Sequence, residues 1–199
     1  DFNMDAIFDR VVREFFPNTT IPFWKKWLFR TAFGNKVFSR LIYNERLVNK
    51  NGVEWVNAVV ELLELKCESE HHQLNNIPGH GATVVISNHP TVIDGLSLIH
   101  TVSRVRSDIK IIANHVLPII FPQVSELTIG IENMAGKMSH KKFREMNDHL
   151  RKGGVLIICP AGKLANWSLS GLQEHKWHPG FLQLAMRNNG TNSYYGSKQ

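Results

Sequence analysis

Short apolar runs alternate with amphipathic stretches over the second half of the chain, and this alternation constrains the fold more than any other feature. Strand-like runs occupy residues 83–87, 109–113, 127–131 and 155–159. Helical periodicity is present at residues 95–105, 139–152 and 179–189. Strands that alternate with helices predict an α/β domain with a largely parallel or mixed sheet flanked by helices.

The N-terminal part of the chain has helical patterns without strand-like runs. Residues 21–30 interleave large aromatic side chains with cations, which fits a membrane headgroup interface and fits equally well a helix packed on the domain. Residues 52–67 predict a second helix with one broad apolar face, and residues 68–80 predict a polar loop. We therefore expect an N-terminal helical pair within residues 1–76, with potential membrane contact, and an α/β core at 77–199, together one compact unit.

The charge of the chain favours anionic partners. A net charge of +6 and a pI near 9.4 do not by themselves separate nucleic acid from acidic lipid or a phosphate-bearing cofactor. No nucleic acid is expected, because no recognised binding motif accompanies the charge. The cations of residues 139–152 are expected to form a solvated helix face. No apolar run reaches the roughly 18 to 20 residues needed to cross a bilayer, so any membrane contact is expected to be peripheral.

The cysteine and histidine spacings do not predict a metal site. Cys67 and Cys159 are far apart and are expected to be reduced thiols of a cytoplasmic protein. The ten histidines include His71, His72 and His80, but their spacing matches no compact zinc pattern.

Polar residues at the end of the first predicted strand carry the most chemical information. Asn88 and His89 follow residues 83–87, and Asp94 opens the next predicted helix. On one continuous helix, residues five apart would point about 140° away from each other. With His89 on the turn and Asp94 in the first helical turn, the two side chains can meet. An imidazole held by a carboxylate is suited to take a proton from a hydroxyl.

Each of these residues also has an ordinary structural interpretation. Thr91 and Asp94 fit a capping box, in which the carboxylate only satisfies backbone donors of the helix. His89 alone is more commonly a strand-end histidine bonded to a carbonyl. Residue types leave both interpretations open, and Asp94 can serve in both ways.

The wider pattern resembles the glycerolipid acyltransferase family of the 1-acylglycerol-3-phosphate type. The resemblance covers residues 77–190 and includes Asn-His-x-x-x-x-Asp at residues 88–94, Ile-Ile-Ala-Asn at 111–114 and Cys-Pro-Ala-Gly at 159–162. Trp167 and the Trp-His-Pro-Gly-Phe of residues 177–181 are most similar to the hemolysin-like branch, which resembles lyso-ornithine lipid acyltransferases. The resemblance implies an acyltransferase in which His89 is the general base and Asp94 orients it.

The block that the family uses on the acceptor side is altered. Phe-Pro-Glu-Gly-Thr-Arg is usual there, whereas this chain has Ala161 in place of the glutamate and no arginine at the equivalent position. Lys163 offers one point charge, or is an ordinary solvated lysine. Gly162 permits a close backbone approach or serves the turn. By resemblance, Asn88 and the residues from Pro160 to Lys163 are expected to bind substrate, and amides near Gly162 to stabilise the oxyanion.

A second departure follows the last predicted helix. Relatives continue into a strand with a Val-Pro or Ile-Pro pair, but here Gly190 is followed directly by Thr191, Asn192 and Ser193. We therefore expect that strand to be absent, a segment to be missing between Gly190 and Thr191, and the C-terminal part to be incomplete.

The resemblance implies a fatty acyl transfer to the hydroxyl of a lysolipid. The donor is expected to be acyl-CoA or acyl-ACP, the partners a lysolipid and a CoA thioester or acyl carrier protein, with no bound cofactor. Peripheral contact with the cytoplasmic face of the inner membrane is expected. The alternatives are a non-catalytic lipid-binding protein of the same fold, weakly favoured by Ala161, and a thioester hydrolase in which water replaces the lipid alcohol.

Overall fold

A computed structural model describes Leu41 and residues 44–67, 74–88, 93–132, 139–162, 166–168, 171–173, 175–188 and 191–195, with residues 166–168, 171–172 and 191–195 described by their backbone alone. The chain divides into two compact units, Asp1–Lys50 and Asn51–Gln199. In the first unit the described part includes the short helix α4, Glu45–Val48, whose N-cap Asn44 accepts a hydrogen bond from the Arg46 amide. The second unit contains the sheet.

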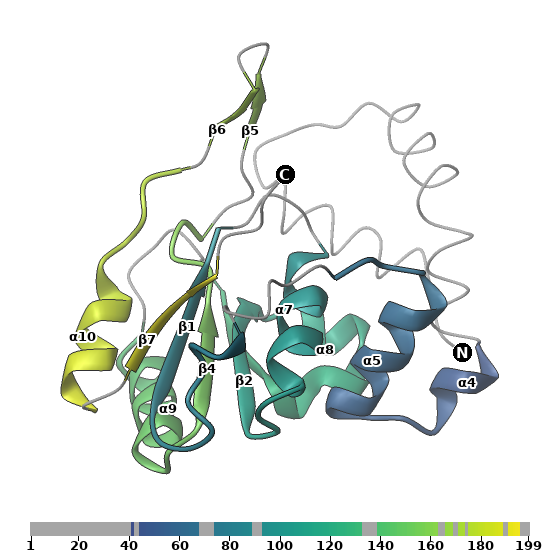
Figure 1. Ribbon diagram of the computed structural model, residues 1–199, viewed down its shortest axis with the longest axis horizontal. Helices are drawn as coiled ribbons and strands as arrows, with labels where there is room; N and C mark the ends of the chain where they lie inside the picture. The colour runs from purple at the N-terminus through teal and green to yellow at the C-terminus, as the bar shows by residue number, and fades with distance from the viewer. Residues whose placement is uncertain are drawn as a thin grey trace. The chain divides into compact units, whose positions relative to one another are not determined.

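A five-stranded sheet, parallel throughout, forms the centre of the second unit (Figure 1). Its strand order is β3-β2-β4-β1-β7. The strands are β1 (Thr83–Ser87), β2 (Ile109–Asn114), β3 (Thr128–Ile131), β4 (Val155–Ile158) and β7 (Thr191–Tyr195). Every residue of β1 and β4 is buried, as expected for inner strands that helices cover on both faces.

One face of the sheet packs against α9 (His140–Arg151) and α10 (Gly180–Arg187). Met146 and Leu150 of α9 and Leu184 of α10 join a cluster with alternate strand residues, among them Val84 and Leu156. The two helices also contact each other, because Asn188 donates to the Asn147 side chain at 2.9 Å and the Arg187 guanidinium lies over the Phe143 ring. Burial of apolar side chains is the main contribution that stabilises this layer.

The opposite face carries α7 (Asp94–Ser103), on which α5 (Gly52–Leu62) packs. A Cβ atom added at Gly95 would lie 3.3 Å from Cδ1 of Ile111, so α7 runs close to β2. Asn57 of α5 and His100 of α7 are hydrogen-bonded at 2.8 Å. Two short elements, α8 (Leu117–Ile120) and the 3-10 helix η2 (Pro122–Leu127), connect β2 to β3.

The predicted α/β class with a largely parallel sheet flanked by helices is confirmed. The four strand-like runs become β1 to β4 with bounds that shift by one residue at most. The helix expected at residues 52–67 ends at Leu62, because Glu64 adopts a left-handed φ of 51° and breaks the helical path. The aromatic and cationic segment at residues 21–30, half of the expected N-terminal pair, lies outside the described residues.

The expected absence of a strand after the last helix is wrong. Thr191–Tyr195 forms β7, which pairs in parallel with β1, Thr83 against Thr191. Its sequence gave little signal, because Thr-Asn-Ser-Tyr-Tyr is polar and lacks the apolar run of an inner strand, whereas β7 is an edge strand with one neighbour. The hairpin of β5 (Asn166–Ser168) and β6 (Gly171–Gln173) was also not anticipated.

Helices long and apolar enough to span a bilayer do not occur among the described residues.

Candidate active site

The site predicted from the sequence lies where β1 and β4 end. These strands are neighbours in register, with Ile86 opposite Ile158, so the residues that follow them emerge side by side. Helix α7 begins at Asp94, after the short connection from β1. Carboxyl ends of parallel strands are the usual location of ligand sites in such sheets.

Asn88 connects the ends of the two strands. It is buried, with 9% of its surface exposed. Its side-chain oxygen accepts a hydrogen bond from the Ser87 hydroxyl at 3.3 Å, and its backbone carbonyl accepts one from the Cys159 thiol at 3.8 Å. This buried position favours a role in shaping the site.

Asp94 is the first residue of α7 and is partly exposed. Ile93 is the N-cap residue and makes no side-chain capping bond, whereas a capping box would have placed the N-cap at Thr91, which lies outside the described residues. A carboxylate in the first turn of a helix is favoured by the helix dipole. Asp94 therefore lies at the edge of the sheet where a base would need orienting.

Cys159 is the neighbour of Asp94 that sequence reasoning missed. Burial raises the pKa of its thiol to about 12, and the nearby negative charge of Asp94 acts in the same direction. A thiol with so high a pKa stays protonated at neutral pH and is a poor nucleophile. The sequence predicts only a reduced thiol at this position, because it does not reveal that β1 and β4 are adjacent.

The predicted acceptor-side residues form a tight turn after β4. Pro160 and Ala161 are buried, the latter with 5% exposure, and the Pro160 carbonyl accepts a hydrogen bond from the His178 amide at 3.0 Å. Gly162 has a φ of 62°, a conformation that favours glycine, and its amide donates to the Cys159 carbonyl at 3.0 Å. Because that amide is engaged within the turn, an oxyanion contact from Gly162 would require this bond to break.

The structure brings together five of the seven predicted site residues at the ends of β1 and β4: Asn88, Asp94, Pro160, Ala161 and Gly162. His89 and Lys163 lie outside the described residues, so the pairing of His89 with Asp94 stays a prediction. The contact of His178 with Pro160 was not foreseen, although the Trp-His-Pro-Gly-Phe segment that contains it was noted. Within the described ranges, no group of three or more His, Cys, Asp or Glu side chains could hold a metal ion.

A parallel α/β sheet with ionisable and polar side chains at its carboxyl edge defines a class of enzyme folds without fixing the reaction. The reaction class comes from the sequence comparison. A family model described as Acyltransferase matches residues 68–192, more than half of the 199 residues, and the chain belongs to this family. The matched region contains every predicted site residue. No curated protein and no solved structure matches the chain significantly. The protein is thus an acyltransferase.

Proposed function

We propose that the protein transfers a fatty acyl group from an acyl thioester to the hydroxyl of a lysolipid. The observation that carries this proposal is the family match over residues 68–192, which includes both members of the His89 and Asp94 motif. The position of Asp94 at the start of α7, beside the end of β4, supports it.

In the proposed reaction His89 is the general base. Its imidazole takes the proton of the lipid hydroxyl while the oxygen attacks the thioester carbonyl carbon, and Asp94 orients the ring and stabilises the imidazolium. The tetrahedral intermediate then collapses, the carbon–sulfur bond breaks, and the departing sulfur receives the proton from His89. The products are an acylated lipid and a free thiol, so no proton or electron is left over.

The donor is acyl-CoA or acyl-ACP and no cofactor stays bound in this proposal. A lysolipid acceptor places the enzyme peripherally on the cytoplasmic face of the inner membrane. The turn from Pro160 to Gly162, with Lys163 next in sequence, lines the acceptor side. The hydrogen bond from the His178 amide to the Pro160 carbonyl supports a fixed conformation of this turn during turnover.

The test is acyl transfer by purified variants, read as lipid product by mass spectrometry. His89→Ala is expected to lower kcat by about 10² to 10⁴, the usual contribution of general-base catalysis, with an unchanged circular dichroism spectrum. Asp94→Asn is expected to lower it less. His80→Ala, at an exposed loop histidine outside the site, is the matched control and should retain full activity.

Full transfer activity in folded His89→Ala would rule out the general-base mechanism. Free fatty acid formed at the same rate with and without lysolipid would instead identify a thioester hydrolase.

The acceptor is proposed to carry a phosphate-free headgroup, as in the lyso-ornithine lipid branch. Ala161 contributes only a buried methyl group where phosphate-acylating relatives have a glutamate, and a lysine ammonium matches phosphate less well than a bidentate guanidinium. In a competition with one acyl thioester, lyso-ornithine lipid should be acylated at least about ten times faster than lysophosphatidic acid. A clear preference for lysophosphatidic acid would refute this assignment and leave the acyltransferase reaction itself intact.

A further inference from the structure

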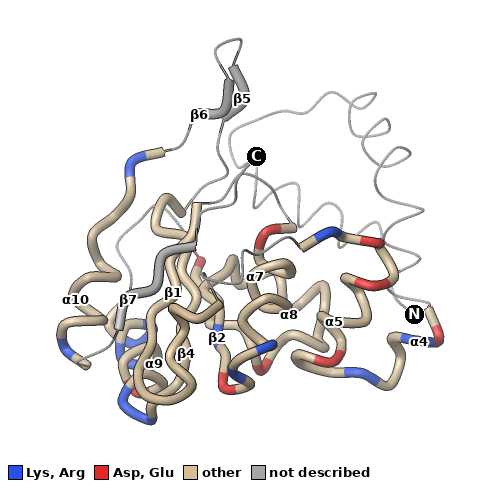
Figure 2. Tube along the Cα trace, viewed as in Figure 1, with Lys and Arg blue, Asp and Glu red and all other residues tan. Residues whose placement is uncertain are grey.

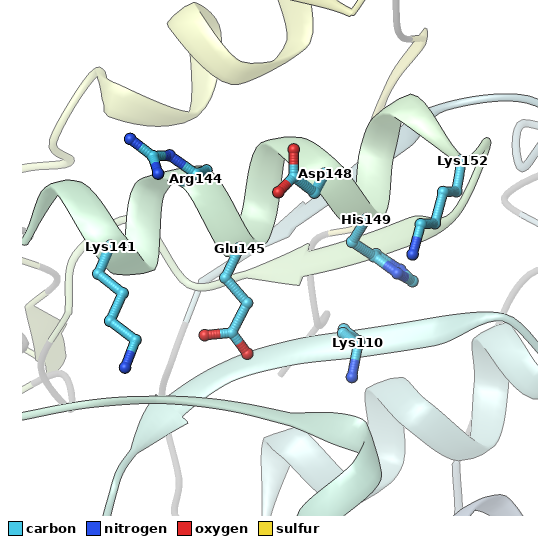
Figure 3. Close-up of a pocket in the computed structure, with 7 residues that line it drawn as sticks. All are labelled: Lys110, Lys141, Arg144, Glu145, Asp148, His149 and Lys152. Atoms are coloured by element: carbon cyan, nitrogen blue, oxygen red, sulfur yellow. The ribbon is translucent and has the colours of Figure 1, made fainter.

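A hollow of about 410 Å³ runs along α9, next to the start of β2 (Figure 3). Its volume falls in the range of about 300 to 1,000 Å³ that is usual for small-molecule sites. All the side chains that line it are polar: Lys110, Lys141, Arg144, Glu145, Asp148, His149 and Lys152. Such a lining suits a charged ligand better than an acyl chain.

This hollow is separate from the candidate active site. Lys110 is the second residue of β2, and Lys152 precedes the first residue of β4 by three positions, so both mark the amino ends of these strands. Asn88, Cys159 and Asp94 lie at the carboxyl ends instead. The length of the strands therefore separates the end of the hollow that Lys110 and Lys152 form from the residues proposed to react.

The two acidic side chains that line the hollow do not neutralise its four cations. Glu145 forms its ion pair with Lys142, which does not line the hollow, at 2.9 Å. Lys110 donates to the backbone carbonyl of Glu126 at 2.7 Å, which leaves its charge uncompensated. In the part of the chain that the structure describes, Lys141, Arg144 and Lys152 make no ion pair. Figure 2 shows basic residues gathered along α9 and the turn that follows it.

We propose that this hollow binds a small organic anion that carries two or more phosphate groups. Cations stand at both ends, with Lys141 near the start of α9 and Lys152 just after its end, about 16 Å apart along a helix that rises 1.5 Å per residue. Pyrophosphate, whose two phosphates are adjacent, reaches only one end at a time, but its higher charge is attracted by several of these cations more strongly than that of one orthophosphate. Arginine and lysine are the residues that bind phosphate oxygens most strongly.

The acidic side chains of the hollow argue against a polyanionic surface as its ligand. Glu145 and Asp148 lie between the two cationic ends of α9 and would repel a nucleic acid or an anionic bilayer laid along the helix. A small ligand can turn its phosphates toward the cations and away from these two carboxylates, whereas a bilayer or a duplex laid along the helix meets both. The ligand chemistry is shared by the coenzyme of an acyl thioester and by other polyphosphate metabolites.

The pKa of His149 should change when a ligand occupies the hollow. Burial lowers the pKa of its ring, and the positive charge of Lys110 contributes to the same direction, whereas Asp108 opposes it. The other charged groups that line the hollow are Lys141, Arg144, Lys152, Glu145 and Asp148. A phosphate bound among them stabilises the imidazolium and raises its pKa, so His149 takes up a proton on binding and contributes more to the affinity at pH 6 than at pH 8.

The proposal is tested by titration calorimetry of the full chain with orthophosphate, pyrophosphate and coenzyme A. Pyrophosphate or coenzyme A should bind at least about tenfold more tightly than orthophosphate, and Lys110→Ala with Lys152→Ala should weaken that binding about tenfold or more. Asp148→Asn should strengthen it. The matched control is Lys66→Ala with Arg151→Ala, which removes the same charge from exposed positions outside the hollow and should change affinity less than about twofold.

Binding of coenzyme A without pyrophosphate would assign the hollow to the donor coenzyme, and binding of both would assign it to polyphosphates in general. The proposal is overturned if the wild-type protein binds none of the three at millimolar concentration, or if the two double variants lose affinity equally. Lys152→Ala alone, which removes no hydrogen bond among the described residues, covers the case in which the double variant does not fold. His149→Gln should bind each ligand as tightly as the wild type at pH 8 and more weakly than the wild type at pH 6, a comparison that cancels the protonation of the ligand itself.

Discussion

Cys159 combines proximity to the proposed catalytic carboxylate with low chemical reactivity. Its pKa of about 12, raised by burial and then by Asp94, leaves almost no thiolate at pH 8. We predict that iodoacetamide at pH 8 alkylates Cys67 at least about tenfold faster than Cys159, as measured by mass spectrometry of the two peptides. Equal rates in the native protein would contradict this, and equal rates in denaturant are the control.

Arg106 is the buried charge on which the amino edge of the sheet depends. Only 6% of its surface is exposed. Its guanidinium forms two bonds to the Asp108 carboxylate, at 2.8 and 2.7 Å, and donates to the carbonyls of Pro78, Gly81 and Gly153. These contacts join the loop before β1, the start of β2 and the turn before β4.

We predict that Arg106→Lys lowers the free energy of unfolding by about 3 kcal/mol, because one ammonium cannot replace five directed donors and leaves buried carbonyls unpaired. Urea denaturation measures the change. Arg104→Lys, at an exposed neighbouring position, is the control and should change stability by less than about 0.5 kcal/mol. A similar loss in both variants would show that the contacts of Arg106 are unimportant.

The same contacts determine how the ionisation of Asp108 makes the stability of the protein depend on pH. Its bonds to Arg106 hold the pKa of this carboxyl below its ordinary value of 3.8. A lowered folded-state pKa gives stability that is fully present above the unfolded-state value and is lost as the pH falls through the folded-state value. The stability difference between wild type and Asp108→Asn should therefore be constant from pH 7 to pH 5 and shrink below about pH 4. A difference that persists unchanged at pH 2 would contradict the assignment.

The carboxyl end of β3 has no room for a side chain at Gly130. A Cβ atom there would lie 2.9 Å from the Cα atom of His115, and this backbone cannot move without shifting the end of β2. Gly130→Ala is predicted to lower the unfolding free energy by about 1 to 3 kcal/mol. Gly79→Ala, where nothing lies within 4 Å, is the matched control, and a thermal unfolding midpoint equal in both variants would contradict the prediction.

The sequence predicts helices and strands with a clear hydrophobic pattern well. It does not predict elements that form because they pair with a neighbouring strand. β1 and β4 are continuous apolar runs because both faces are covered, so their local sequence was sufficient. In contrast, β7 is polar and exists through its pairing with β1, which no local pattern records. The end of α5 was misplaced because the left-handed residue, Glu64, has none of the usual preference for that conformation.

The candidate site was predictable only where its residues are close in sequence. Asn88 and Asp94 were identified from one motif, and the structure places them at the edge predicted for them. The contact of Cys159 with Asn88 and that of His178 with Pro160 depend on strand order and on a long connection, and neither leaves a sequence signal. Cys159 and Asn88 are 71 residues apart in sequence, so their contact can be predicted only when the topology is known.

The net charge of +6 is expected to draw the protein to anionic bilayers. The segment at residues 23–30, which lies outside the described part of the chain, combines aromatic side chains with Lys25 and Lys26 and is the proposed contact. Each cation near an anionic surface contributes about 1 kcal/mol, so Lys25→Glu with Lys26→Glu should weaken vesicle partitioning by about 2 kcal/mol or more, roughly thirtyfold. Sedimentation with vesicles of anionic and of zwitterionic lipid measures it.

Charge alone has to be separated from the contribution of this segment. Lys50→Glu with Lys66→Glu reverses two lysines elsewhere and changes the net charge by the same amount. Because long-range attraction depends on total charge while interfacial contact depends on position, only the first pair of substitutions should reduce binding strongly at 0.15 M salt, where the Debye length is about 8 Å. Equal losses in both double variants would mean that residues 23–30 do not contact the bilayer, and that attraction to the lipid surface comes from the net charge of the chain.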